Sequence, residues 1–145
     1  MLNFKRSRAW VGVCLFFLVT HAMASSLNKI VVFGDSLSDN GNLYEYMGHN
    51  MPMSPPYYKG RFTDGPVWVE HLAKHYFPDN PEAHLLDYAF GGAAIDNEDA
   101  DDMDDEEGDM SSLDRGLDSY LLAHNDKANA SSLYVIWIGS NNYLA

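Results

Sequence analysis

Three short apolar runs, each followed by a glycine-containing turn, constrain the fold of this chain more than any other feature. The runs cover residues 30–33, 85–90 and 133–138, and stretches with helical periodicity separate them. Short runs rich in β-branched and aromatic residues are typical of buried strands. Because strands that alternate with helices form parallel sheets, the sequence predicts an α/β fold with three layers, α/β/α, and a mainly parallel sheet.

Two amphipathic helices are predicted between these strands. Residues 63–66 combine cap-type residues with a proline and start the first helix, which ends before Pro78. Ser111 or Ser112 caps the second helix, which ends at residues 125–126. Residues 43–61 show no period and are expected to form a long loop. The expected core faces are Val69, Leu72, Ala73 and Tyr76 in the first helix and Leu113, Leu117, Tyr120 and Leu121 in the second.

The first 24 residues have the layout of a secretory signal peptide. Three basic residues precede an apolar run over residues 9–19, and Ala22-Met23-Ala24 forms a small-x-small cleavage site. An uncleaved membrane anchor is the rival interpretation, but the run is shorter than the roughly 20 residues that a spanning helix needs. We therefore expect a signal peptide over residues 1–24 and export to the periplasm or the extracellular space. The remaining residues 25–145 stop directly after the third strand and its turn, so we expect them to be the N-terminal part of a domain whose C-terminal part is missing.

The charge of the chain is concentrated in one acidic segment. The formal net charge is -12, and ten of the 21 acidic residues lie in residues 96–109. Duplex nucleic acid is not an expected partner, because phosphate binding needs clustered lysine and arginine. The acidic segment lacks the ligand spacing of an EF-hand loop. We therefore expect a solvated insertion over residues 96–109, no metal site and no cofactor.

Unusual polar turns follow all three predicted strands. Ligands of open parallel sheets bind at the carboxyl ends of the strands, and the turns there are residues 34–42, 91–92 and 139–142. A serine on a strand-to-helix turn, here Ser36, can expose its hydroxyl while its backbone N–H faces a developing oxyanion. Glycine in the second turn allows close backbone approach, and Asn141 in the third offers an amide donor. Taken singly, each residue would be assigned to a helix cap or a tight turn; together they indicate a nucleophilic site.

These turns resemble, in order, three sequence blocks of the GDSL (SGNH) lipases and esterases. Residues 33–42 read FGDSLSDNGN, residues 88–93 read YAFGGA and residues 137–143 read WIGSNNY. The resemblance implies a flavodoxin-like hydrolase fold with Ser36 as the nucleophile. It also implies that Gly92, or alternatively its neighbour Gly91, and Asn141 form the oxyanion hole. Asn142 stands where the family usually has aspartate.

The resemblance also implies a function. The family's catalytic aspartate and histidine lie in an Asp-x-x-His block near the C-terminus, and this chain contains no such block. Residues 60–65, GRFTDG, recur in the lipase-like branch, so we expect a secreted serine esterase that acts on phospholipid or lysophospholipid, with acyl transfer as a second activity. Its partners would be a lipid or other ester substrate and, transiently, a membrane surface. The alternatives are a carbohydrate or short-chain acetylesterase and an inactive truncated fragment.

A loop that lines an acyl-chain groove is a further expectation. Methionine and tyrosine side chains are concentrated in the predicted long loop, and their softness and apolarity suit a lipid tail. Packing of the same loop against the core is the alternative. The side chains in question are Met47, Met51, Met53, Tyr57 and Tyr58.

Overall fold

The computed structural model describes residues 26–95 and 112–144 of the chain. The predicted signal peptide and the acidic segment 96–109 lie outside these residues. Among the described residues, no helix combines the length and apolarity needed to cross a bilayer. The elements, in chain order, are β1 Lys29–Gly34, α1 Asn42–Tyr46, α2 Trp68–Tyr76, the 3-10 helix η1 Glu82–His84, β2 Leu85–Asp87, α3 Leu113–Ala123, β3 Ser132–Trp137 and α4 Asn141–Leu144.

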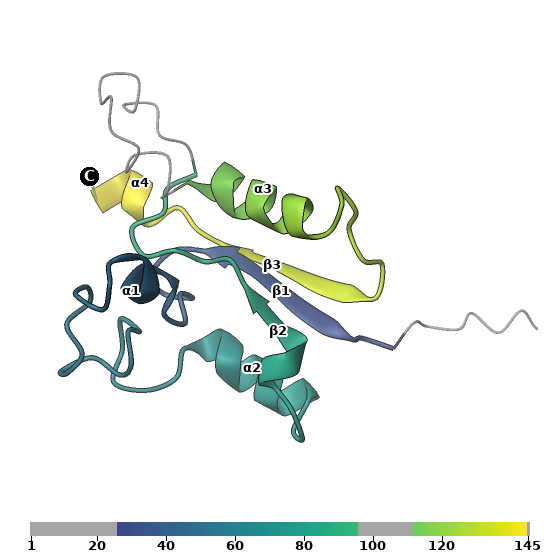
Figure 1. Ribbon diagram of the computed structural model, residues 1–145, viewed down its shortest axis with the longest axis horizontal. Coiled ribbons are helices and arrows are strands. Elements are labelled where there is room, and N and C mark those ends of the chain that lie inside the picture. The colour runs from purple at the N-terminus through teal and green to yellow at the C-terminus, as the bar shows by residue number, and fades with distance from the viewer. Residues whose placement is uncertain (1–25, 96–111, 145) are drawn as a thin grey trace, which may run out of the picture.

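The three strands form one parallel sheet, and β1 lies in its centre. The strand order is β2-β1-β3, with Ile30 of β1 aligned with Leu85 of β2 and Leu133 of β3. All three strands therefore end at the same edge of the sheet, from which α1 and α4 continue (Figure 1). The predicted α/β fold with a parallel sheet is confirmed.

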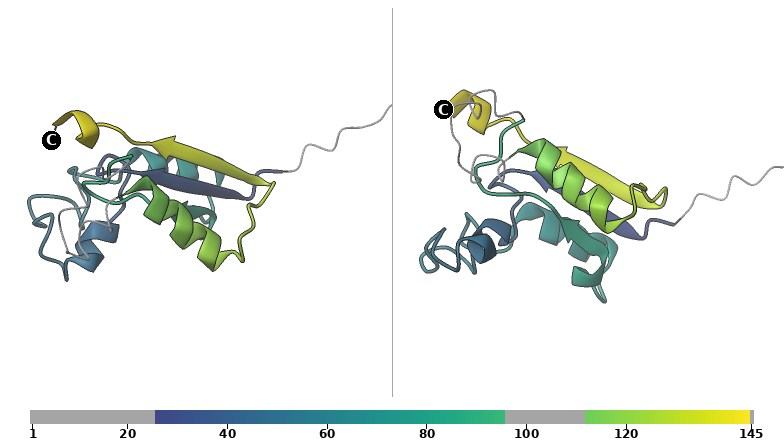
Figure 2. Two further views of the ribbon diagram at one scale, coloured as in Figure 1. Left: turned by 90° about the horizontal axis from the view of Figure 1, so that it is seen from above. Right: turned by 45° about the horizontal axis from the view of Figure 1, so that its top comes forward.

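Helices cover both faces of the sheet and give the predicted three layers (Figure 1). Ile30 and Val32 of β1 pack with Val69 and Ala73 of α2 in one buried cluster. Val31 and Phe33 point to the opposite face, where they pack with Tyr120 of α3. Alternate residues of a strand face opposite sides, so a central strand covered on both faces is apolar at every position. This explains the uninterrupted apolar run that predicted β1. The other views show α3 lying along the strands (Figure 2).

The predicted helix α2 begins two residues later than its sequence signals suggest. Its first residue is Trp68, because the carboxylate of Glu70 accepts a hydrogen bond from the backbone N–H of Val67 at 2.8 Å. This acceptor satisfies one of the free N–H groups at the start of a helix. The predicted core position Tyr76 is wrong: its side chain is 53% exposed, and it is the last residue of the helix.

Helix α3 is capped as predicted, but the prediction for one residue of its core face is wrong. The Ser112 hydroxyl accepts a hydrogen bond from the Arg115 N–H at 3.3 Å. Leu117, expected in the core, is 41% exposed. The helix instead approaches the sheet at Gly116, where a Cβ atom would lie 3.1 Å from the carbonyl oxygen of Tyr88. A small residue lets the helix approach closely, and the leucine beside it turns toward solvent.

Two predicted boundaries also differ from the structure. The predicted loop over residues 43–61 begins with a short helix, α1, rather than with irregular chain. The second strand is shorter than the predicted 85–90, since β2 ends at Asp87. The chain nevertheless continues along β1, because the N–H groups of Tyr88 and Phe90 donate to the carbonyl groups of Val32 and Gly34 at 2.8 and 2.9 Å.

Candidate active site

The turn after β1, here called the nucleophile turn (residues 35–42), is tightly wound around Asp35. Asp35 is fully buried, and its Oδ1 atom accepts a hydrogen bond from the Leu37 N–H at 3.0 Å. Its carbonyl oxygen accepts further bonds from the N–H groups of Ser38 and Asp39, both at 3.0 Å. Ser36 is half-buried at the top of this turn, and its backbone N–H has no hydrogen-bond partner among the described residues. Within the described residues, the turn thus leaves the backbone N–H of Ser36 available to a ligand.

The second turn, called the glycine turn (residues 91–93), is bonded to the nucleophile turn. The Gly91 N–H donates to Asp39 Oδ2 at 2.8 Å. The Gly92 N–H carries no hydrogen bond within the described part of the chain, and Gly92 is exposed with a φ of 85°. Such a φ favours glycine. Of the two glycines that the sequence left open, Gly92 is therefore the one whose N–H stays available to a ligand.

The third turn, called the asparagine turn (residues 139–142), is bonded to both of the others. The Ser140 hydroxyl donates to Asp35 Oδ2 at 2.6 Å, and the Asn141 Nδ2 donates to the Ala93 carbonyl at 2.8 Å. One amide hydrogen of Asn141 is thereby used, and the second remains for another acceptor. Asn142, the departure from the family pattern, accepts a bond from the Ile95 N–H at 3.0 Å. The three turns form a closed ring of hydrogen bonds at one edge of the sheet.

In the described part of the chain, no side chain that could act as a base is hydrogen-bonded to Ser36. None of the five described histidines is hydrogen-bonded to Ser36. Three of them form hydrogen bonds with other residues. The bonded ones are His49 to Glu45, His84 to the Asn28 carbonyl and His124 to the Tyr120 carbonyl. In residues 26–95 and 112–144, no group of histidine, cysteine and carboxylate side chains could hold a metal ion.

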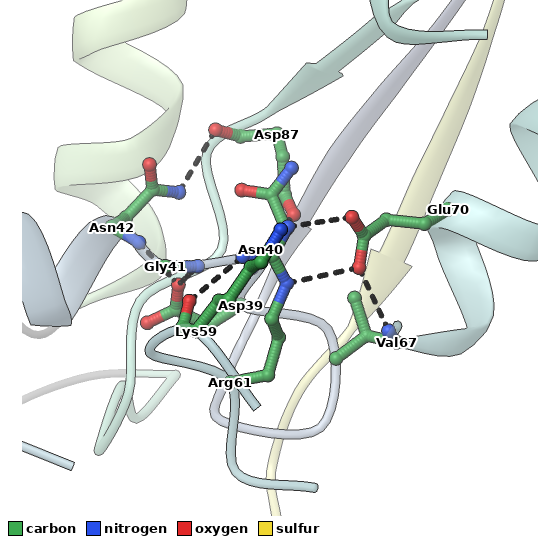
Figure 3. Close-up of polar contacts among 9 residues, drawn as sticks. All are labelled: Asp39, Asn40, Gly41, Asn42, Lys59, Arg61, Val67, Glu70 and Asp87. Atoms are coloured by element: carbon green, nitrogen blue, oxygen red, sulfur yellow. Dashed lines mark hydrogen bonds and ion pairs between the residues drawn. The ribbon is translucent and has the colours of Figure 1, made fainter. Parts of the chain in front are cut away.

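A polar cluster that the sequence did not predict lies beside the nucleophile turn (Figure 3). The Arg61 guanidinium donates to both carboxylate oxygens of Glu70, at 3.1 and 2.6 Å, and to the Lys59 carbonyl at 2.8 Å. The hydrogen bond to Glu70 raises the pKa of Arg61 above its ordinary value. The one sequence signal near this cluster was the GRFTDG block, which contains Arg61. The ion pair anchors the long loop to the start of α2.

Only two of the five side chains expected to line an acyl-chain groove lie together at a surface hollow. A surface hollow of about 770 Å³ is lined by Tyr57 and Tyr58, but Met47, Met51 and Met53 do not line it. Met51 and Met53 are 50% and 71% exposed. The alternative, packing of these two side chains against the core, is excluded by the same exposure.

Asp87, at the end of β2, is a half-buried acid beside the nucleophile turn. It accepts hydrogen bonds from the N–H groups of Asn40 at 3.2 Å and Ala89 at 2.9 Å. Burial raises the pKa of Asp87 to about 8, and the nearby Asp39 raises it further, whereas the bonds from Ala89 and Asn40 oppose the shift. Asp87 is therefore protonated in the folded protein at neutral pH.

This raised pKa predicts a specific pH dependence of stability. The folded state holds the Asp87 proton up to about pH 8, whereas an unfolded aspartate loses it near pH 3.8. The folded state thus binds more protons between these values, so the free energy of unfolding should fall as the pH rises through this window, by on the order of a few kcal/mol. Urea denaturation of wild type and Asp87→Asn from pH 5 to pH 8 measures this. The wild-type curve should slope more steeply, and parallel curves would contradict the assignment.

A parallel α/β domain with a serine on the turn after its central strand, and with donor groups on the neighbouring turns, is typical of serine hydrolases. The GDSL-like Lipase/Acylhydrolase family matches residues 30–145, so the chain belongs to this family. This match confirms the resemblance seen in the sequence blocks.

Similar curated proteins include three bacterial ones. The chain is 34% identical over 138 residues to a phosphatidylcholine-sterol acyltransferase of Aeromonas hydrophila, a match that covers 92% of this chain and 39% of the relative. It is 32% identical to the secreted effector protein SseJ of Salmonella typhimurium and 31% identical to a thermolabile hemolysin of Vibrio parahaemolyticus, each over 81% of this chain and 26% of the relative. The chain thus spans about two fifths or less of the length of these relatives.

Proposed function

We propose that the protein containing this chain is an exported serine ester hydrolase that acts on lipid carboxylic esters and transfers the acyl group to water or to an alcohol. The observation that carries the proposal is the ring of three turns. In it, the N–H groups of Ser36 and Gly92, which have no partner among the described residues, lie on turns bonded to each other. The name of the acyltransferase relative supports lipid esters as substrates.

In the proposed reaction, Ser36 Oγ attacks the acyl carbonyl and its proton passes to a histidine base. The family resemblance implies that this base belongs to an Asp-x-x-His block, which the sequence given does not contain. The N–H groups of Ser36 and Gly92 and the free amide hydrogen of Asn141 would stabilise the oxyanion. The tetrahedral intermediate breaks its bond to the alcohol of the ester, which leaves with the proton from the histidine, so that an acyl-enzyme remains. Water or a second alcohol then attacks the acyl-enzyme and gives its proton to the histidine. The bond to Ser36 breaks, the acyl product leaves and Ser36 regains its proton.

Export and partners belong to the same proposal. The leader pattern over residues 1–24 supports a signal peptide, and relatives named as a secreted effector and a hemolysin support export. The partners would be a lipid ester and, transiently, the membrane surface that contains it. The negative charge of the chain argues against nucleic acid.

A panel of substrates tests the proposed function. The full-length gene product is incubated with phosphatidylcholine vesicles, with and without cholesterol, and with acetylated xylan. Release of fatty acid from the vesicles, and formation of steryl ester when cholesterol is present, are the expected results, since a lipid esterase should favour long acyl chains. Release of acetate from xylan without attack on the vesicles would instead assign a carbohydrate acetylesterase. Absence of turnover with every substrate would contradict the enzyme assignment.

A further inference from the structure

A single buried carboxyl group joins the nucleophile turn to the glycine turn. Asp39 is fully buried, and its two carboxyl oxygens accept four backbone hydrogen bonds. Oδ1 accepts from the N–H groups of Gly41 and Asn42 at 2.8 and 2.6 Å, as Figure 3 shows. Oδ2 accepts from Leu43 at 3.1 Å and from Gly91 at 2.8 Å. Three donors lie 2, 3 and 4 residues after Asp39 in the chain, and the fourth, Gly91, lies 52 residues away.

Gly91 is held at this position by packing as well as by the hydrogen bond. It is buried, and a Cβ atom there would lie 2.6 Å from Leu43 Cδ2 and 2.7 Å from Phe62 Cε2. The next N–H along the chain belongs to Gly92, which has open space around it. The place of the Gly92 N–H relative to Ser36 therefore depends on where Gly91 is fixed.

No other side chain of the nucleophile turn makes this connection in the described residues. Asn42 donates to the carbonyl groups of Asp87 and Ala89, which precede the glycine turn. Among the described side chains of the nucleophile turn, only that of Asp39 is bonded to the glycine turn itself. Its position thus couples the turn that holds Ser36 to the turn that holds Gly92.

We propose that Asp39 is a positioning residue for the ester hydrolysis described above: it fixes Gly91 against the nucleophile turn and so sets the place of the Gly92 N–H as an oxyanion donor. The inference rests on the proposed function, because it requires Ser36 as the nucleophile. Asp39 itself does not touch the substrate, since both of its oxygens are occupied by backbone N–H groups. Misplacing a preorganised donor should weaken stabilisation of the transition state more than binding of the substrate.

Two variants remove the connection in different ways. Asp39→Asn keeps the size of the side chain but leaves one acceptor oxygen for four N–H donors. Replacing Gly91 by glycolic acid, by semisynthesis of the full-length protein, exchanges its N–H for an oxygen atom and adds no side chain. The matched control replaces Leu43 by leucic acid, which removes another bond to the same Asp39 oxygen but one within the adjoining segment.

The readout compares an oxygen ester with its thiono analogue, in which sulfur replaces the carbonyl oxygen. Sulfur is a weaker hydrogen-bond acceptor, so loss of an oxyanion donor slows the oxygen ester more than the thiono ester. For Asp39→Asn and the glycolic acid variant we expect kcat on the oxygen ester to fall about 10- to 100-fold with little change in KM, and the oxo-to-thiono rate ratio to fall with it. The leucic acid control should keep the wild-type ratio. A loss of folded protein would slow both esters equally and leave the ratio unchanged.

Labelling by a fluorophosphonate separates this inference from the proposed function. If wild-type Ser36 is labelled but the glycolic acid variant retains the wild-type ratio, Asp39 is not a positioning residue and the proposed function stands. If wild-type Ser36 is not labelled, the proposed function fails and the inference fails with it. Should Asp39→Asn not fold, the glycolic acid variant alone decides, because it leaves the buried side chain in place.

Discussion

Ser36→Ala in the full-length protein is expected to reduce ester turnover to background and to abolish covalent labelling by a fluorophosphonate. The substitution removes the one atom that would bond to the acyl group, and no binding interaction can replace it. The turn itself should persist, because its hydrogen bonds run through Asp35 and Asp39 rather than through the Ser36 side chain. Mass spectrometry of the labelled protein measures the effect.

The matched control lies two residues away in the same turn. Ser38 is fully buried, and its hydroxyl accepts a hydrogen bond from Trp68 Nε1 at 3.1 Å. Ser38→Ala should lower stability by about 1 kcal/mol and retain labelling. Labelling of Ser36→Ala at the wild-type rate would show that Ser36 only caps the following segment.

Asn141→Ala should lower kcat by about 10² to 10³, or roughly 3 to 4 kcal/mol, with KM little changed. The side chain would donate a hydrogen bond that strengthens as charge develops on the carbonyl oxygen, so its loss affects the transition state more than the bound substrate. Labelling of Ser36 by a fluorophosphonate should persist at a lower rate. Steady-state kinetics on a soluble ester provide both constants.

Asn142→Ala is the control for this prediction. Asn142 also bonds across the turns, to the Ile95 N–H, but it is not a proposed donor to the oxyanion. Its loss should change kcat only a few-fold. A rise in KM without a fall in kcat for Asn141→Ala would assign Asn141 to binding of the ground state.

The sheet could be predicted from the sequence because its signals are local. The run of residues 30–33 is apolar at every position, as expected of a strand covered on both faces, and a glycine-containing turn follows each strand. The helix faces were less predictable. Periodicity selected Leu117 and Tyr76 for the core, whereas the close approach of Gly116 to Tyr88 turns α3 so that Leu117 faces solvent.

The convergence of the three turns could be predicted from the sequence, but the bonds that join them could not. Ser36, Gly92 and Asn141 each follow a strand, so their convergence at one edge is a consequence of parallel topology. The bonds that join their turns are different, because Asp39 meets Gly91, and Ser140 meets Asp35, only in the folded chain. No spacing or composition encodes such contacts between residues that lie far apart in the chain.

The ring of turns also links chemical competence to folding. Its three bonds close chain separations of 52, 105 and 48 residues. Closing segments of this length costs conformational entropy, which the neighbouring strands must offset by pairing first. The ring should therefore form only as the sheet is completed, and partly folded chains would have a serine without its neighbouring donors. Hydrolytic capacity would then appear in step with the native state and be absent before it.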